Sequence, residues 1–197
     1  MQVLLKIEKG EKLIMNIWHD IDERRIRPNN FIAFVEIERG SKNKYELDKE
    51  TGLIILDRVL FTATHYPLSY GFIPKTLAQD EDPLDVFILC NQSIQSGRIV
   101  QCYPIGVINM SDQSEQDEKI IAVPFGDPIY NRYTDITELP SNLALELSHF
   151  LSTYKQLENK KVEIKSIEGH EAAAERIAVS MAAYKERFGS KKDKKDN

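Results

Sequence analysis

Short runs of strand-forming residues dominate the chain between residues 31 and 124. Bulky and β-branched side chains recur in these runs, and Gly or Pro residues separate them, as is typical of strands joined by turns. The predicted strands cover residues 31–38, 44–47, 53–60, 85–90, 98–110 and 119–124. Closely spaced strands without helices between them favour an antiparallel barrel or sandwich.

After Pro140 the apolar positions change to the helix period. One stripe recurs at three- and four-residue steps and predicts a helix; it consists of Leu143, Leu147, Phe150, Leu151, Tyr154 and Leu157. A short strand is predicted over residues 162–167, and an alanine-rich second helix over residues 171–188. The predicted fold class is α+β: a small closed antiparallel β-barrel, OB-like, with two C-terminal helices packed outside it.

The 197 residues contain no internal repeat and no linker rich in Gly, Pro or Ser. We therefore predict a single domain over residues 1–197, with residues 1–30 as an N-terminal extension and residues 189–197 as a basic, flexible tail. The longest apolar runs are far shorter than the roughly 18 residues that a membrane span needs, and charge follows too soon after Met1 for a signal peptide. A cytoplasmic protein without a membrane partner is expected.

Charge and cysteine content exclude several classes of function. The chain has 31 acidic and 26 basic side chains, a net charge of −5, and this acidic balance disfavours binding to nucleic acid. Two cysteines, Cys90 and Cys102, are too few for a disulfide scaffold and have no zinc-site spacing. The composition permits a site rich in carboxylates.

The most informative segment is Asp80-Glu81-Asp82-Pro83-Leu84-Asp85, directly before an apolar strand. Two carboxylates about 4 Å apart repel by roughly 4 kcal/mol at an effective dielectric constant near 20, so their convergence needs a cation or raised pKa values. The spacing of Gly and Glu does not match a calcium EF-hand. Oxygen ligands favour Mg²⁺ first and Mn²⁺ second, although an exposed acidic turn stays open as the alternative.

A second acidic cluster, residues 112–119, lies between two apolar strands. Taken alone, this cluster is typical of a polar hairpin loop. Two such loops can meet at one mouth of a small barrel, where Lys119 would add a cation beside Asp112 and Asp117. Carboxylates together with fixed cations suit a metal-complexed polyanion, because metals bind the carboxylates and cations bind phosphate oxygens.

With these motifs in register, the chain resembles the family I soluble inorganic pyrophosphatases of the bacterial type. Residues 80–85 match the family's Asp-x-Asp-Pro-x-Asp loop, and the similarity extends from about Phe31 to the C-terminal helix. Further matching segments are residues 35–37, 44–50, 56–58, 66–74, 112–119 and 154–155. Two departures stand out. Glu81 replaces a usually small residue and is expected to point outward, and the first thirty residues match poorly, so that we interpret Trp18 as a packing or interface residue.

The resemblance implies an Mg²⁺-dependent enzyme that hydrolyses pyrophosphate to two orthophosphates. A metal-activated hydroxide would attack phosphorus in line, with no covalent intermediate. Asp82 would be the general base, and Tyr70 would donate its hydroxyl nearby. The implied metal ligands are Asp80, Asp85, Asp112, Asp117 and, through waters, Glu36. The implied substrate-binding residues are Lys44, Arg58, Tyr70, Lys119, Tyr154 and Lys155. Several Mg²⁺ ions would bind per site, with Mn²⁺ as a substitute.

Two other functions are alternatives. A non-catalytic oligonucleotide-binding barrel would require a basic groove lined by aromatic residues, whereas this chain has acidic loops. A metal-dependent phosphohydrolase acting on a nucleotide or organic phosphate lacks support from any Gly-rich phosphate loop. Chain length resembles the hexameric branch of the family, so a homo-hexamer is expected by resemblance.

Overall fold

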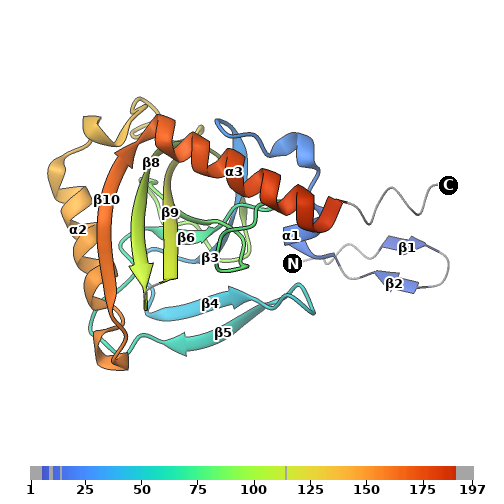
Figure 1. Ribbon diagram of the computed structural model, residues 1–197, viewed down its shortest axis with the longest axis horizontal. Helices are drawn as coiled ribbons and strands as arrows, with labels where there is room; N and C mark the ends of the chain where they lie inside the picture. Colours follow the sequence, from blue (N-terminus) through green and yellow to red (C-terminus); the bar gives the residue numbers. More distant parts are fainter. Residues whose placement is uncertain (1–5, 9–10, 14, 114, 190–197) are drawn as a thin grey trace.

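A six-stranded mixed sheet forms the centre of the protein in the computed structural model, which describes residues 6–8, 11–13, 15–113 and 115–189. The strand order is β10-β8-β3-β6-β7-β9 (Figure 1). Because β8 also pairs with β9, the successive pairings lead back to β8. The strands are β3 (Phe31–Ile37), β6 (Ser69–Phe72), β7 (Asp85–Ile88), β8 (Ile99–Asp112), β9 (Glu115–Pro124) and β10 (Val162–Gly169).

The prediction of an antiparallel arrangement is wrong for one pair, because β7 and β9 run parallel. The long strand β8 lies between them in the sequence and pairs antiparallel with β9. It returns the chain so that β9 enters beside β7 in the same direction, which is the crossover that a parallel pair requires. Apolar residues alternate in the same way in parallel and antiparallel strands, so the sequence could not reveal the direction of this pair.

Strand β6 was not predicted. It has four residues, and Gly71 interrupts its bulky pattern. A Cβ atom on Gly71 would lie 1.8 Å from the carbonyl oxygen of Phe34 in the neighbouring strand β3, so the close pairing of β3 with β6 requires glycine at this position.

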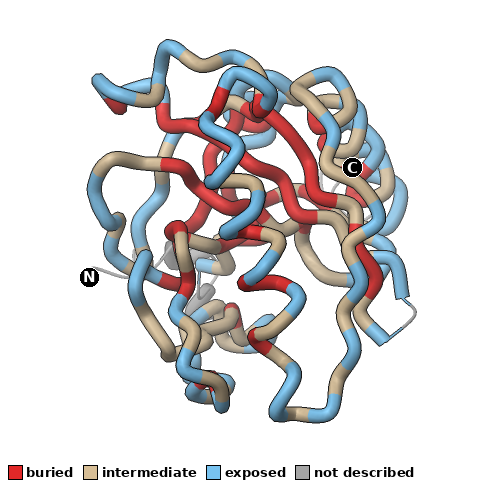
Figure 2. The backbone as a smooth tube through the Cα atoms, turned by 90° about the vertical axis from the view of Figure 1, so that its left-hand side faces the viewer, coloured by how far each residue is buried: buried red, intermediate tan, exposed pale blue. Residues whose placement is uncertain are grey.

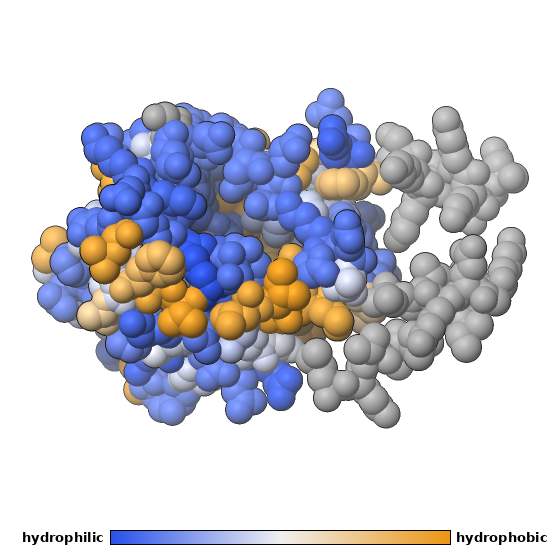
Figure 3. Space-filling view, turned by 90° about the horizontal axis from the view of Figure 1, so that it is seen from below, coloured by the Kyte–Doolittle hydropathy of each residue, from blue (hydrophilic) through white to orange (hydrophobic). Residues whose placement is uncertain are grey.

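Strands β4 (Asn43–Leu47) and β5 (Ile54–Val59) form a separate two-stranded sheet. They confirm two predicted strands, but neither pairs with the central sheet among the described residues. Large apolar side chains of β5 and its flanks are exposed, namely Leu53, Ile55, Leu56, Val59 and Phe61. Figure 3 views the molecule from the side of this hairpin and shows apolar atoms gathered in a band there. A second short hairpin consists of β1 (Lys6–Glu8) and β2 (Glu11–Leu13).

The two predicted C-terminal helices are present as α2 (Ser141–Thr153) and α3 (His170–Phe188). Successive residues of β9 point to opposite faces. Ile121 belongs to the hydrophobic cluster that contains Phe150 of α2, and its neighbour Ile120 belongs to the cluster that contains Ile177 of α3. Figure 2 shows the buried residues concentrated along the strands between these layers.

The predicted stripe of the first helix extends too far at its end. Helix α2 ends at Thr153, and Leu157 lies in the 3₁₀ turn η3 (Gln156–Glu158) with its side chain exposed. Two further 3₁₀ turns are η1 (Glu23–Arg25) and η2 (Ile136–Glu138). In the described part of the chain, no helix combines the length and apolarity that crossing a bilayer demands.

The N-terminal extension packs onto the end of α3 through the short helix α1 (Ile17–Asp20). Trp18 is buried, and its indole Nε1 donates a hydrogen bond to the carbonyl oxygen of Thr76 at 2.8 Å. Its ring contacts the ring of Phe188, with 5.5 Å between ring centroids. The interpretation of Trp18 as a packing residue is therefore confirmed. Nearly all of the predicted basic tail lies outside the described residues.

Candidate active site

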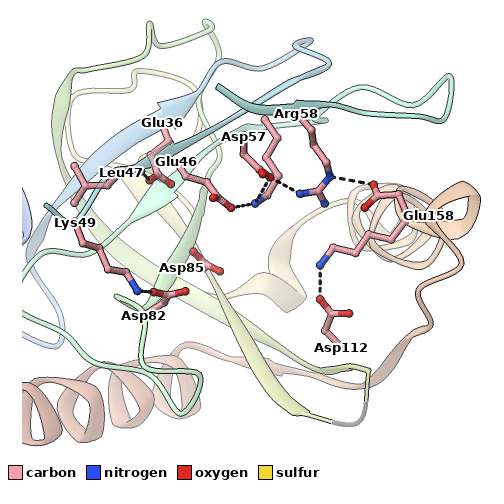
Figure 4. A network of polar contacts seen from close by, with 12 residues as sticks. Glu36, Glu46, Leu47, Lys49, Asp57, Arg58, Asp82, Asp85, Asp112 and Glu158 are labelled. Atoms are coloured by element: carbon pink, nitrogen blue, oxygen red, sulfur yellow. Dashed lines mark hydrogen bonds and ion pairs between the residues drawn. The ribbon is translucent and has the colours of Figure 1, made fainter. Parts of the chain in front are cut away.

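A cavity of about 360 Å³ collects almost every predicted site residue. Strands of the central sheet, the β4–β5 hairpin, the loop before β7 and the segment after α2 contribute its walls (Figure 4). The predicted residues that line it are Glu36, Lys44, Tyr70, Asp80, Asp82, Asp85, Asp112, Asp117, Lys119, Tyr154 and Lys155. Arg58 is the predicted residue that does not line it.

The second acidic cluster is two strand ends rather than a loop. Asp112 is the last residue of β8, and β9 already begins at Glu115. Because side chains alternate along a strand, Asp117 and Lys119 share the face of β9 toward the cavity. Glu118 between them points the other way and lies 3.6 Å from Arg176 of α3. The predicted hairpin is present, but the segment between its two strands is much shorter than expected.

A local hydrogen bond and a proline restrict the first acidic loop. The amide of Asp82 donates to Asp80 Oδ1 at 3.1 Å, and Pro83 restricts the residue before it to extended conformations. Glu81 is exposed, as the outward orientation expected for it requires. Its φ angle is 65°. Asp80 and Asp82 thus both reach the cavity while Glu81 faces solvent.

Lys119 neutralises two of the carboxylates. Its ammonium contacts Asp85 and lies 2.6 Å from Asp117 Oδ1. Burial alone would lower the pKa of Lys119, but Asp85 and Asp117 raise it well above its usual range, so this lysine stays charged. Burial raises the pKa of Asp117, Lys119 opposes the rise and Asp85 adds to it.

Two further lysines contact acidic side chains of the cavity. Lys155 pairs with Asp112, and Lys49 pairs with Asp82. The ring of Tyr154, buried at the end of α2, lies 5.2 Å from the Lys155 ammonium. Among the described residues, every aspartate of the site except Asp80 therefore has a lysine partner.

Glu36 is buried at the cavity wall, where its Oε1 accepts a hydrogen bond from the amide of Leu47 at 2.8 Å. Burial, with a smaller contribution from the charge of Asp85, raises the pKa of Glu36 to about 8. Burial also raises the pKa of Asp80 to about 6, and Asp85 and Asp117 add to this rise. Negative charge is thus crowded beyond what the lysines offset.

The donor set fits a hard divalent cation. Within the described ranges, no three His, Cys, Asp or Glu side chains already form a metal-holding group, and lysines contact four of the five aspartates. However, all available donors are oxygens, as Mg²⁺ prefers, and Asp112 Oδ1 is buried without a hydrogen-bond partner among the described residues. Burial is the main cause of the raised pKa values of Glu36 and Asp80, and the charge of Asp85 adds to both.

The cations of the β4–β5 hairpin lie at one side of the site. The Lys44 ammonium contacts Glu46 and lies 3.2 Å from Asp57 Oδ2. Arg58 contacts the same Asp57, and its Nε donates to Glu158 Oε1 at 3.1 Å. Arg58 therefore joins the site through its neighbours rather than at the cavity wall.

Sequence reasoning missed four polar residues of this network: Glu46, Lys49, Asp57 and Glu158. Glu46 could have been found, because it follows Lys44 by two residues on the same strand face. Glu158 had no such signal, since it is 100 residues from Arg58. A larger cavity of about 930 Å³ beside the start of α3 contains none of the predicted residues.

Comparisons with known proteins identify the family of this chain. A family model described as inorganic pyrophosphatase matches residues 33–185. Soluble inorganic pyrophosphatase 1 of Arabidopsis thaliana is 45% identical over 169 residues, which are 86% of this chain and 80% of that protein. Soluble inorganic pyrophosphatase 2 of Chlamydomonas reinhardtii is 42% identical over 175 residues, covering 89% of this chain and 91% of that protein.

Solved bacterial structures extend the similarity to the fold. The inorganic pyrophosphatase from Thermus thermophilus superposes with a TM-score of 0.82 at 36% identity, covering 87% of this chain and 99% of that one. The enzyme from Helicobacter pylori gives a TM-score of 0.78 at 40% identity, with coverages of 80% and 95%. The chain belongs to the family I soluble inorganic pyrophosphatases, a family of enzymes.

Proposed function

We propose that this protein hydrolyses inorganic pyrophosphate to two orthophosphates with Mg²⁺ as its cofactor. One observation supports this most strongly. Asp80 and Asp85 from one segment and Asp112 and Asp117 from another line the same cavity. Such a cavity, with lysines interspersed, suits a polyanion that arrives with divalent cations.

The five aspartates and Glu36 are the proposed acidic groups, and of these Asp80, Asp85, Asp112 and Asp117 would hold the metal directly. When bound, Mg²⁺ ions supply charge neutralisation for the phosphates and acidify a water for attack on phosphorus. Mn²⁺ offers the same oxygen chemistry. Glu36 would act through waters, since it already accepts the amide of Leu47.

Asp82 is the proposed general base. Its side chain is about half exposed, at 50%, and it can therefore accept a proton from an attacking water and release it to solvent. Tyr70 is the proposed hydrogen-bond donor beside it. Burial, with the charge of Asp85, raises the pKa of Tyr70 well above its usual range, so its hydroxyl keeps its proton and can donate.

The remaining cations, together with Tyr154, would bind the two phosphate groups. Lys44 and Arg58 would stabilise the leaving phosphate, and Lys119, Tyr154 and Lys155 would bind the other one. Burial lowers the pKa of Lys119, but Asp85 and Asp117 raise it well above its usual range. Burial also lowers the pKa of Lys155, but Tyr154 and Asp112 raise it above its usual range. Fixed positive charge aimed at developing negative charge is the largest catalytic contribution in such reactions.

We also infer that β3, β6, β7, β8 and β9 close into a small OB-like barrel, because their pairings lead back to β8. A single domain, a homo-hexamer and a cytoplasmic location stay predictions. Light scattering of the purified chain tests the hexamer, because a monomer or dimer mass would contradict it.

The deciding experiment measures phosphate release from magnesium pyrophosphate, ATP and a phosphate monoester in parallel. We expect release from pyrophosphate and little from the other two, and loss of release when a chelator removes the metal. A folded protein that leaves pyrophosphate intact would contradict the proposal. A preference for ATP would favour a nucleotide phosphohydrolase, and inactivity combined with oligonucleotide binding would favour a non-catalytic barrel.

A further inference from the structure

Glu158 forms a nearly buried ion pair with Arg58. Its side chain is 8% exposed and that of Arg58 is 20% exposed. Arg58 Nε donates to Glu158 Oε1 at 3.1 Å, across 100 residues of sequence (Figure 4). Removing one partner of such a pair leaves a charge with little water around it, which is far more costly than losing an exposed pair.

The pair connects two parts of the molecule that backbone pairing leaves separate. Arg58 lies on β5, and it faces Lys44 of β4 in the strand register. The β4–β5 sheet has no strand pairing with the central sheet in the described residues. Side-chain contacts therefore contribute to the positions of Lys44 and Arg58 relative to the cavity.

Different side chains fix different parts of the hairpin. Glu36 of the central sheet accepts the amide of Leu47, the last residue of β4. Glu158 holds Arg58, which pairs with the other end of β4. Both contacts use a carboxylate with little exposure.

The segment that contains Glu158 also forms part of the site. It is the 3₁₀ turn η3, which begins directly after Lys155. Lys155 contacts Asp112, and the preceding Tyr154 is buried against Phe150, with 5.1 Å between ring centroids. One short turn thus links the residues proposed for the two phosphate groups.

The guanidinium of Arg58 is oriented by two carboxylates, which leave its third nitrogen without a partner among the described residues. Nη1 contacts Asp57, and Nε donates to Glu158. Nη2 is buried and has no hydrogen-bond partner in the described part of the chain. A guanidinium held at Nε and Nη1 by two carboxylates has a fixed orientation, and phosphate recognition by arginine depends on such orientation.

We propose that Glu158 is a positioning residue that fixes Arg58, and through it the β4–β5 hairpin, against the segment of Tyr154 and Lys155. This inference rests on the proposed pyrophosphatase function. Glu158 does not touch the substrate. It sets the direction of the Arg58 donor and the spacing between the two groups of phosphate-binding cations.

A double-mutant cycle on kcat/KM for magnesium pyrophosphate tests this role. Because a misplacement of about 1 Å can cost about 100-fold in rate, we expect Glu158→Ala to lower kcat/KM by about that factor. Glu158→Gln, which keeps the shape but loses the charge, should lower it by about tenfold. In an Arg58→Ala background, neither change should lower kcat/KM further, because the group that Glu158 positions is absent.

Glu163→Gln is the matched control. Glu163 lies on β10 close to Glu158 in the sequence, is exposed and forms no ion pair among the described residues, so it should leave kcat/KM unchanged. Urea unfolding of each variant monitors folding. If Glu158→Ala does not fold, the cycle is run with Glu158→Gln and Arg58→Ala.

The outcomes separate the two proposals. Equal losses from the Glu158 variants in the wild-type and Arg58→Ala backgrounds would indicate a general structural role and overturn the positioning role. Unchanged kcat/KM in the Glu158 variants would also overturn the positioning role. Neither of these outcomes affects the proposed function as long as the wild-type chain hydrolyses pyrophosphate. A wild-type chain that is inactive on pyrophosphate would overturn both.

Discussion

Asp85 and Lys119 face each other in the register of the parallel pair β7–β9, and their side chains form an ion pair. Lys119 is 5% exposed, a degree of burial that a lysine tolerates only with compensating charge. Asp117, two residues earlier on the same strand, supplies the second contact. The parallel pairing that the sequence did not reveal is therefore what joins the two acidic segments.

Lys119→Met should strongly destabilise the metal-free protein. Asp85 and Asp117 would lose their shared cation, and breaking a buried pair in this way costs about 3–5 kcal/mol. The free energy of unfolding from urea titration measures the loss, and Mg²⁺ should reduce it. Lys165→Met, at an exposed lysine of β10, is the control. Equal stability of the two variants would contradict the buried pair.

Asp82→Asn should fold normally and lose most of its turnover. Removing a general base lowers the rate by about 100-fold to 10,000-fold, whereas the lost ion pair with Lys49 is half exposed and contributes about 0–1 kcal/mol to stability. Steady-state kinetics and urea unfolding measure the two effects. Glu81→Gln, at the exposed neighbour, should keep its turnover. Full activity of Asp82→Asn would remove Asp82 from the base role.

The metal-free protein should lose stability as the pH rises from about 6 to 8. The pKa of Glu36 rises from an ordinary 4.5 to about 8 on folding, so in this range the folded state holds a proton that the unfolded state has released. One such proton gives a slope of about −1.4 kcal/mol per pH unit. The raised pKa of Asp80, about 6, acts in the same direction at lower pH.

Glu36→Gln should flatten this slope, because glutamine accepts the amide of Leu47 without titrating. Urea unfolding at several pH values, with metal removed by a chelator, makes the comparison. Glu50→Gln, at an exposed position, should retain the wild-type slope. A slope in Glu36→Gln as steep as that of the wild type would show that another group is responsible.

Glu81→Gly should stabilise the protein. Glu81 has a φ angle of 65°, a conformation that costs a residue with a Cβ atom about 1–2 kcal/mol and glycine almost nothing. We expect a gain of about 1 kcal/mol in the free energy of unfolding, since glycine also gives the unfolded chain more freedom. Glu163→Gly, within the strand β10, should destabilise instead. A loss of stability in Glu81→Gly would contradict the strain.

Trp18→Ala should destabilise the protein by about 3–5 kcal/mol, the usual cost of emptying a buried aromatic site. Trp18→Phe, which keeps most of the volume but leaves the carbonyl of Thr76 unpaired, should cost about 1–3 kcal/mol. Turnover per folded molecule should be unchanged in both, because Trp18 does not line the cavity. A loss of turnover at full stability would assign the N-terminal extension a role in catalysis.

The predictable part of the fold is local. The runs of β-branched residues located β3, β4, β5, β7, β8 and β9 to within a few residues, and the three-and-four spacing after Pro140 located α2. Errors arose where a local signal ended early or was interrupted. Gly71 concealed β6, and Leu157 continued the helix period beyond the last helical turn.

The candidate site likewise contains one part that the sequence indicates and another that only the folded chain shows. Asp80, Asp82 and Asp85 could be recognised as a cluster because they lie within six residues of the sequence. The placement of Arg58 was not predictable, because it depends on Glu158, a residue 100 positions away. No spacing rule connects residues on separate elements.

The element types, the two acidic segments and the family could be inferred from the sequence, because each short segment that indicates them is continuous along the chain. Three features could be known only from the folded chain, namely the parallel pair β7–β9, the burial of Lys119 between Asp85 and Asp117, and the contact of Arg58 with Glu158. These features arise from packing between distant segments, where burial strengthens charge interactions and so determines which charges must pair.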